Sequence, residues 1–385
     1  MNTLILGAGV SGVAAAHLAA RLGHSVSVYD RSSQATIPLR AQDYTVHSGA
    51  WADRLLANIG MLVVSPGFPE HSEPIRRALA AGIEIISELE FGVRQLAVPY
   101  VAVTGTNGKT TVTTAIAEML NASNVSAVAA GNIGLPVCGL GPKPARVVVL
   151  EASSFQLRFI DRFHPVAAGI TNVAADHLDW HGTVTDYAAA KARIFENMNP
   201  DELLAYDSDD LGATTLAAQA RCHTVPVSGT RVPSSGIGPE AGMLVIGDSL
   251  VPLGTDDPSF VADLGIAAAI AASVGADTAG SAGHFEASTS ATSSAKRSPL
   301  AAYDSNSSKL AHPGARSTVS PLRAIRWAAP TASASVATTV TGTSTPAATS
   351  GPASPNATTW WTVSGVMFAR SRSLLRPPAR STTFS

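Results

Sequence analysis

The feature that most constrains this chain is a loop rich in glycine and threonine, with one lysine, between an apolar run and a helical pattern. Residues 100–103 are predicted to form a buried strand and residues 112–120 a helix. Backbone N–H groups, a helix N-terminus and a lysine together bind phosphate, and the hydroxyl after the lysine can bind Mg²⁺. The segment therefore predicts a nucleotide-phosphate site in an α/β fold. Its residues are Gly105, Thr106, Asn107, Gly108, Lys109, Thr110 and Thr111.

A second glycine loop lies near the start of the chain, between another expected strand and helix. Its G-x-G-x-x-G pattern uses Gly7, Gly9 and Gly12, with Ser11 inside it and Asp30 at the end of the next strand. This is the dinucleotide-binding fingerprint in its usual context. Taken alone it favours an NAD-dependent oxidoreductase, or simply a tight turn with close helix packing. The phosphate loop argues against hydride transfer, which has no use for a lysine-bearing triphosphate site.

Alternating strands and helices predict parallel sheets in two α/β domains. We expect an N-terminal Rossmann-like domain at residues 1–93 and a central P-loop-type ATPase domain at residues 94–280. Residues 281–385 are rich in Ser, Thr, Ala and Pro, without a strand or helix period, and hold ten Lys and Arg against two acidic residues. Because this segment has little apolar surface to bury, folding would not offset the entropy lost by ordering its chain. We therefore predict a disordered tail. An interaction segment is the alternative.

Four further residues follow predicted strands or lie in a predicted helix. Glu151 comes directly after an apolar strand, where a carboxylate could hold Mg²⁺ or simply be solvated. His177 could be a metal ligand, a general base or neither. Lys191 lies in an apolar helical stretch, where a surface lysine with a buried stem is the ordinary interpretation. Gly67 follows another strand, at a ligand-binding edge or in an ordinary turn.

Five ordered motifs across residues 1–275 resemble the Mur ligase family of peptidoglycan synthesis. They are the phosphate loop, Gly131-Asn132-Ile133-Gly134, residues 150–157, residues 171–179 and Ala190-Lys191. Residues 150–157 are close to the form found in the D-glutamate-adding member. The resemblance implies a ligase that uses ATP and Mg²⁺ to join D-glutamate to UDP-N-acetylmuramoyl-L-alanine through an acyl phosphate.

The resemblance also implies a role for each candidate residue. Lys109, His177 and Lys191 are the expected catalytic residues, and the phosphate loop binds ATP. Thr110 and Glu151 are expected to bind one Mg²⁺, while His177 and a carbamylated Lys191 bind a second. The expected substrate-binding residues, which hold the UDP group and position the substrate, are Gly7, Gly9, Ser11, Gly12, Asp30, Gly67 and Asn132.

The chain departs from the family beyond residue 280. The family carries an F-x-G-x-x-H-R-like signal and an Asp-Ser-Lys-Ala-Thr-Asn-like segment in a third domain, and neither is found here. Asp263 lies where the family usually has an Asn that contacts adenine. We hypothesise that a reading-frame change replaced the third domain, and we expect the chain to bind the UDP substrate but to ligate poorly or not at all. The alternative is a nucleotide-binding protein without ligase activity.

Composition narrows the remaining classes. A net charge of −2 gives no general attraction to nucleic acid or membrane surfaces. Cys138 and Cys222 are too few for a disulfide framework, and their spacing suits no metal site. No apolar run is long enough to span a bilayer, and the N-terminus lacks a basic region and a cleavage site. We therefore expect a cytoplasmic monomer.

Overall fold

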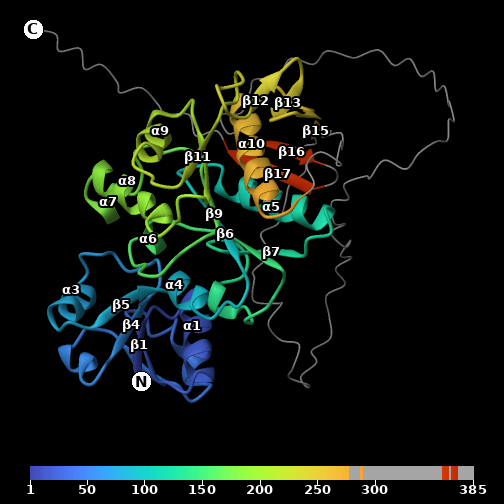
Figure 1. The fold of residues 1–385 in the computed structure, drawn as a ribbon. Coiled ribbons are helices and arrows are strands. Elements are labelled where there is room, and N and C mark those ends of the chain that lie inside the picture. The colour runs from blue at the N-terminus through green and yellow to red at the C-terminus, as the bar shows by residue number, and fades with distance from the viewer. Residues whose placement is uncertain (277–286, 289–357, 364–365, 372–385) are drawn as a thin grey trace, which may run out of the picture. The chain divides into compact units, whose positions relative to one another are not determined.

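The computed structural model describes residues 1–276, 287–288, 358–363 and 366–371. The chain divides into two units, Met1–His284 and Phe285–Ser385. The first unit begins with a five-stranded parallel sheet in the order β3-β2-β1-β4-β5 (Figure 1). Its strands are β1 (Asn2–Leu6), β2 (Ser25–Asp30), β3 (Thr45–Ser48), β4 (Met61–Val64) and β5 (Glu84–Ser87).

Alternate side chains of β1 explain how this sheet is covered. Ile5 packs in a cluster with the alanines of α1 (Val10–Arg21), while Leu4 and Leu6 pack in another cluster with Ile75 of α3 (Glu73–Ala80). Successive side chains of a strand point to opposite faces, so an uninterrupted apolar strand needs a helix on each face. The short helices α2 (Ile37–Arg40) and α4 (Glu88–Val93) complete this part.

A second parallel sheet has six strands in the order β11-β10-β9-β6-β8-β7. Helices α5 and α10 lie on one face, while α6, α8 and α9 lie on the other (Figure 1). The strands are β6 (Tyr100–Thr104), β7 (Ala127–Gly131), β8 (Val147–Glu151), β9 (Ala167–Ile170), β10 (Leu203–Asp207) and β11 (His223–Val227). The helices are α5 (Lys109–Ala122), α6 (Ser154–Leu157), α7 (Leu178–His181), α8 (Val184–Ala192), α9 (Leu211–Ala217) and α10 (Pro258–Ser273).

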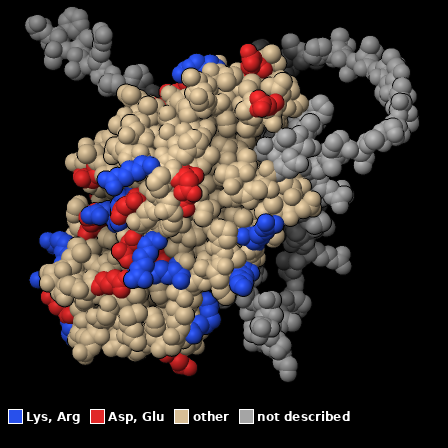
Figure 2. Space-filling model, in the orientation of Figure 1, with Lys and Arg blue, Asp and Glu red and all other residues tan. Residues whose placement is uncertain are grey.

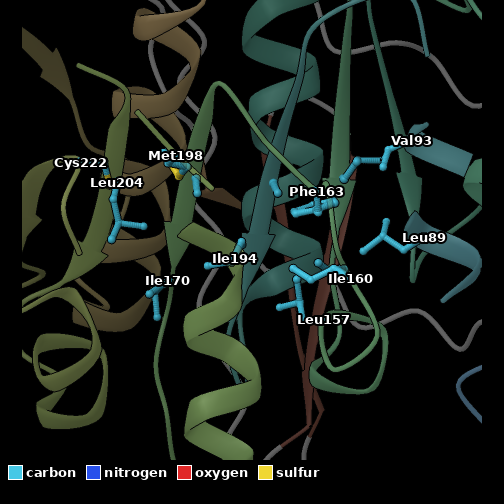
Figure 3. Close-up of a cluster of buried hydrophobic side chains, with 14 of the residues drawn as sticks. Leu89, Val93, Leu157, Ile160, Phe163, Ile170, Ile194, Met198, Leu204 and Cys222 are labelled. Carbon is cyan, nitrogen blue, oxygen red and sulfur yellow. The ribbon is translucent and has the colours of Figure 1, made fainter. Parts of the chain in front are cut away.

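The largest buried cluster shown lies against this second sheet (Figure 3). The cluster contains side chains of β8, β9 and β10, together with Leu157 of α6, Phe163 and Ile194. At roughly 25 cal/mol for each square ångström of apolar surface, such burial is the main term that holds the edge residues in place. On the other face, Gly169 leaves room for Ile266 and Ile270 of α10, since a Cβ there would lie 2.9 Å from each.

These elements confirm the predicted α/β fold with parallel sheets. A hairpin follows the second sheet, formed by β13 (Met243–Ile246) and β14 (Ser249–Pro252), with β12 (Gly238–Glu240) beside them. In the second unit, β15 (Ala287–Ser288), β16 (Thr358–Val363) and β17 (Val366–Ser371) form a small antiparallel sheet. The rest of the predicted tail lies outside the described residues, so its disorder stays a prediction.

Several polar bonds connect the two parallel sheets of the first unit. Ser87 N donates to Phe159 O (2.7 Å), and Cys138 N donates to the Glu88 carboxylate (2.7 Å). Arg158 Nε donates to Glu70 Oε2 (2.7 Å). These hydrogen bonds connect the end of the N-terminal sheet with the loops of the second sheet region.

The surface and the helices add two facts. On the face drawn in Figure 2, acidic and basic side chains are interspersed over the N-terminal sheet and its helices. Among the helices that the structure describes, none has the length and apolar character needed to cross a bilayer.

Candidate functional site

The phosphate loop leaves β6 and enters α5 at the carboxyl edge of the second sheet. Gly105 and Gly108 have φ of +154° and +82°, values that favour glycine. A Cβ on Gly105 would lie 1.8 Å from Thr171 Oγ1, so no side chain fits there. Lys109 Nζ donates to the carbonyls of Gly105 and Thr106, both at 3.0 Å. The lysine therefore lies over its own loop, where a phosphate would bring negative charge.

The loop lies where the strand order reverses, between β6 and β9. Thr106 N donates to Asn172 O (2.8 Å), and Asn107 N donates to Asn172 Oδ1 (2.9 Å). Ligands of open α/β sheets bind at such reversal points, beyond the carboxyl ends of the strands. Asn172, two residues after the end of β9, therefore holds the phosphate loop through its carbonyl and its side chain, a role that spacing did not reveal.

Glu151 is the last residue of β8 and only 2% exposed, so the interpretation as a solvated carboxylate is wrong. Thr110 Oγ1 donates to its Oε2 (2.7 Å) and Asn132 Nδ2 donates to its Oε1 (2.8 Å). The close approach depends on Gly131, where a Cβ would lie 2.4 Å from Glu151 O. Residues from three separate motifs thus meet at one carboxylate.

Lys191 is 1% exposed, so it is not a surface lysine. Its Nζ donates to Gly105 O (2.6 Å) and lies 4.5 Å from the ring centroid of Tyr187. Burial first, and then the charge of Lys109, lowers the pKa of Lys191 to about 7. An amine with this pKa is partly neutral near pH 7 and can react as a nucleophile.

Tyr187 is a site residue that sequence reasoning missed. Its hydroxyl lies 3.1 Å from Thr106 Oγ1, which connects α8 to the phosphate loop. Tyr187 and Lys191 are four residues apart, so a helix places both on one face. That spacing in the predicted helix was the available signal.

His177 precedes α7 in a left-handed conformation, with φ of +51°. Its side chain is 47% exposed, and its Nε2 lies 3.5 Å from Asp176 Oδ2. Its ring contacts Phe155, with centroids 4.9 Å apart, and Tyr187, with centroids 6.3 Å apart. The structure therefore brings His177 to the same edge as Lys191 through Tyr187.

The first glycine loop follows β1 at the reversal point of the N-terminal sheet. Gly7 has φ of +101°, and a Cβ on Gly12 would lie 1.9 Å from Gly7 O. Asp30 Oδ2 accepts from Ala8 N and its Oδ1 from Ser32 N, each at 2.8 Å. Both oxygens of the Asp30 carboxylate thus hold the backbone beside the first glycine loop.

The other expected substrate-binding residues surround this loop or face the second sheet. Gly9, Gly67 and Asn132 are exposed, and Ser11 is half-buried in the first turn of α1. Ser65 lies two residues before Gly67. Its buried hydroxyl has no hydrogen-bond partner among the residues that the structure describes. The loop edge thus offers exposed backbone and small side chains to a ligand.

The residues present suit Mg²⁺ at one position. Thr110 and Glu151 provide oxygen atoms, which Mg²⁺ prefers. Lys191 as an ammonium has only donors and cannot bind a cation. Within the described ranges no group of three or more His, Cys, Asp or Glu could hold a metal. The second predicted Mg²⁺ position thus depends on chemical modification of Lys191.

Family models match the two parallel-sheet regions separately. Residues 1–87 match the Mur ligase MurD-like N-terminal domain, and residues 103–232 match the Mur ligase middle domain. These two segments belong to the Mur ligase family. The family assignment made from the sequence motifs is thereby confirmed.

Two similar relatives are named UDP-N-acetylmuramoylalanine–D-glutamate ligase. That of Caldanaerobacter subterraneus is 34% identical over 64% of this chain and 56% of the relative. That of Shouchella clausii is 39% identical over 61% of this chain and 53% of the relative. The chain therefore spans about half the length of the curated relatives it matches. A solved murein peptide ligase from Psychrobacter arcticus gives a TM-score of 0.47 at 20% identity, covering 71% of this chain and 65% of that one.

Proposed function

We propose that the chain is an ATP-dependent ligase that adds D-glutamate to UDP-N-acetylmuramoyl-L-alanine in peptidoglycan synthesis, with a low turnover because the family's third-domain signals are not found in its sequence. The observation that carries the proposal is the buried Glu151 carboxylate, held between Thr110 of the phosphate loop and Asn132. A carboxylate fixed beside a phosphate loop suits a metal-nucleotide complex. The relatives' name supplies the two substrates.

In this proposal Lys109 and the loop N–H groups bind the β- and γ-phosphates of ATP. Thr110 and Glu151 hold Mg²⁺, which would supply charge neutralisation at the phosphate oxygens. Transfer of the phosphoryl group to the substrate carboxylate requires positioning and such neutralisation. The amine of D-glutamate then displaces phosphate and forms the amide bond.

In the proposal, Lys191 would bind the second metal ion after carbamylation. Its neutral Nζ attacks the carbon of CO₂ and loses a proton, which gives a carbamate with two oxygen ligands. The lowered pKa of Lys191 favours this reaction, because only the unprotonated amine is nucleophilic. His177, at the same edge, would share the metal with the carbamate.

A binding experiment with a matched control tests the nucleotide part. We expect calorimetry to show Mg²⁺-dependent binding of a non-hydrolysable ATP analogue to the full chain. Lys109→Ala should abolish this binding, while Lys143→Ala, at an exposed lysine in the β7–β8 connection, should not change it. Equal binding by wild type and Lys109→Ala would contradict the assignment.

The UDP part is tested by titrating UDP-N-acetylmuramoyl-L-alanine against NAD. We expect the UDP compound to bind and NAD not to bind, because a lysine-bearing triphosphate loop in the same chain has no use in hydride transfer. Tight NAD binding would instead favour the oxidoreductase interpretation.

A nucleotide-binding protein without ligase activity is the second candidate. The observation in its favour is that the family's two third-domain signals are not found in the sequence. ADP release that depends on D-glutamate would decide for the ligase, and binding of both ligands without ADP release would decide for the second candidate. A cytoplasmic location and a monomeric state stay predictions.

A further inference from the structure

The imidazole of His181, the last residue of α7, lies among the predicted metal-binding residues without an assigned role. It is 3% exposed, and its Nε2 lies 2.9 Å from Ser154 Oγ. Ser154 is the first residue of α6, three positions after Glu151. One hydrogen bond therefore connects the end of α7 to the turn that follows the metal-binding carboxylate.

The ring of Phe155 makes the same connection by packing. It stacks on His181, with centroids 5.5 Å apart and planes at 8°, and it also contacts His177, with centroids 4.9 Å apart. Phe155 thus contacts residues at both ends of α7. Because Phe155 follows Glu151 closely in the chain, these contacts set the separation between Glu151 and His177.

The helix α7, which begins after His177 and ends at His181, is too short to be stable by itself. α7 has four residues, and isolated helices of this length are unstable in water. His177 starts it in the left-handed region, which the surrounding structure must enforce. The position of His177 therefore depends on how α7 is held, through Trp180, which is buried, through α8, and through the contacts of His181 with Ser154 and Phe155 of α6.

The polar atoms of His181 indicate that the imidazole does more at this position than fill space. Burial, followed by the charge of Lys191, lowers its pKa to about 4, so the ring is neutral near pH 7. Its Nδ1 is buried and has no hydrogen-bond partner among the described residues. An unpaired buried polar atom costs stability, so a phenylalanine would pack there at lower cost if the ring only filled space.

We propose that His181 is a positioning residue, which holds α7 on α6 through Ser154 and thereby fixes His177 relative to Glu151 for metal binding. The inference rests on the proposed function, because the metal is the second one of that proposal, which His177 would share with carbamylated Lys191. Partners that orient a metal ligand typically change metal affinity by about 10- to 100-fold when they are removed.

The test uses Mn²⁺ as a paramagnetic probe, titrated by electron paramagnetic resonance into the full chain with ADP and bicarbonate present, so that Lys191 can be carbamylated. His177→Ala gives the effect of losing the ligand itself. We expect His181→Phe, which keeps the stacked ring, and Ser154→Ala each to weaken Mn²⁺ binding by about tenfold. The double variant should be no weaker than either single variant, because both changes remove one interaction. His181→Gln, whose amide can reach Ser154, should recover most of the affinity.

Thermal unfolding of the same variants separates positioning from folding. We expect His181→Phe to unfold close to the wild-type temperature, because the loss of the unpaired Nδ1 offsets the cost of leaving the Ser154 hydroxyl without its partner. Mn²⁺ affinity equal to wild type in His181→Phe, or an equal loss in His181→Gln, would overturn the proposal for His181. Failure of the wild-type chain to bind Mn²⁺ with ADP would instead count against the proposed function, and the inference would fall with it.

Discussion

At the scale of single residues, buried charges decide what the edge of the second sheet can bind. Glu151 is a buried carboxylate, while Lys109 and Lys191 both donate to the carbonyl of Gly105. Two amines beside one carbonyl repel each other, and this repulsion contributes to the lowered pKa of Lys191. A polyanionic ligand would relieve the repulsion, so the ligand-free edge is arranged for negative charge.

Asp263 adds a negative charge to the same edge. A Cβ on Gly108 would lie 2.6 Å from its Oδ1, so the carboxylate of α10 lies against the phosphate loop. Like charges several ångströms apart at a solvated site interact by about 1 kcal/mol. We therefore expect Asp263→Asn to raise the affinity for Mg·ATP about fivefold, measured by calorimetry. Asp256→Asn, at another acidic residue before α10, is the control, and an unchanged affinity for Asp263→Asn would contradict the expectation.

The lowered pKa of Lys191 makes stability depend on pH. The unfolded chain keeps this amine protonated up to its ordinary pKa of 10.5, while the folded chain releases the proton near pH 7. Between these values the unfolded state binds more protons, so the stability of wild type rises with pH. Below about pH 7 the full penalty of burying the charge is present.

Lys191→Met removes this titration and keeps a long buried side chain. We expect the variant's stability relative to wild type to fall as the pH rises from 7 to 9.5, by at most about 1.4 kcal/mol per pH unit. Urea unfolding of both proteins in CO₂-free buffer measures the difference. Parallel curves for the two proteins across this range would show that Lys191 does not titrate there.

At the scale of elements, each of the two glycine loops proposed to bind a ligand follows a strand at a reversal point of its sheet. The phosphate loop follows β6 beside β9, and the first glycine loop follows β1 beside β4. Such loops need glycine where backbone segments cross closely. The close approach of Gly12 to the carbonyl of Gly7 is one example.

The first glycine loop offers a matched pair of substitutions. A Cβ on Gly12 would lie 1.9 Å from Gly7 O, whereas a Cβ on Gly9 would meet nothing within 4 Å. We expect Gly12→Ala to destabilise the protein by about 1–3 kcal/mol through overpacking. Gly9→Ala should leave stability nearly unchanged in the same denaturant titration. Similar losses for both variants would show that the loop does not have this packing.

The motifs and their neighbouring apolar strands could be predicted from the sequence. A strand that is buried on both faces, such as Met61–Val64, consists of apolar residues without interruption. Strands β3, β5, β7, β10 and β11 were not predicted, since polar or small residues interrupt their apolar pattern. Burial of Lys191 and the contacts of Tyr187 and His181 also escaped prediction. These depend on α7 and α8 packing over the sheet edge, which no local pattern encodes.

At the scale of the molecule, side-chain networks join the two parallel sheets of the first unit. Arg94, just after α4, pairs with Glu90 (2.7 Å), with Glu84 of β5 (2.7 Å) and with Asp161 beyond α6 (3.1 Å). Glu90 is fully buried, and its Oε1 also accepts from Arg162 N (3.0 Å). One guanidinium thus neutralises carboxylates from both sheet regions, so unfolding of one region should disturb the other.

Arg94→Met tests this coupling, because it keeps the buried stem and leaves Glu90 without its cation. Removing one partner of a buried pair costs about 3–5 kcal/mol, and we expect a loss near the lower end because Arg162 N still donates to Glu90. Urea unfolding followed by tryptophan fluorescence and by far-ultraviolet circular dichroism should shift to lower urea with both probes together. Arg77→Met is the control, since its pairs with Asp53 and Glu73 are exposed and contribute little. A split into two transitions in wild type, or a loss in Arg94→Met no larger than in Arg77→Met, would show that the two sheet regions are stabilised independently.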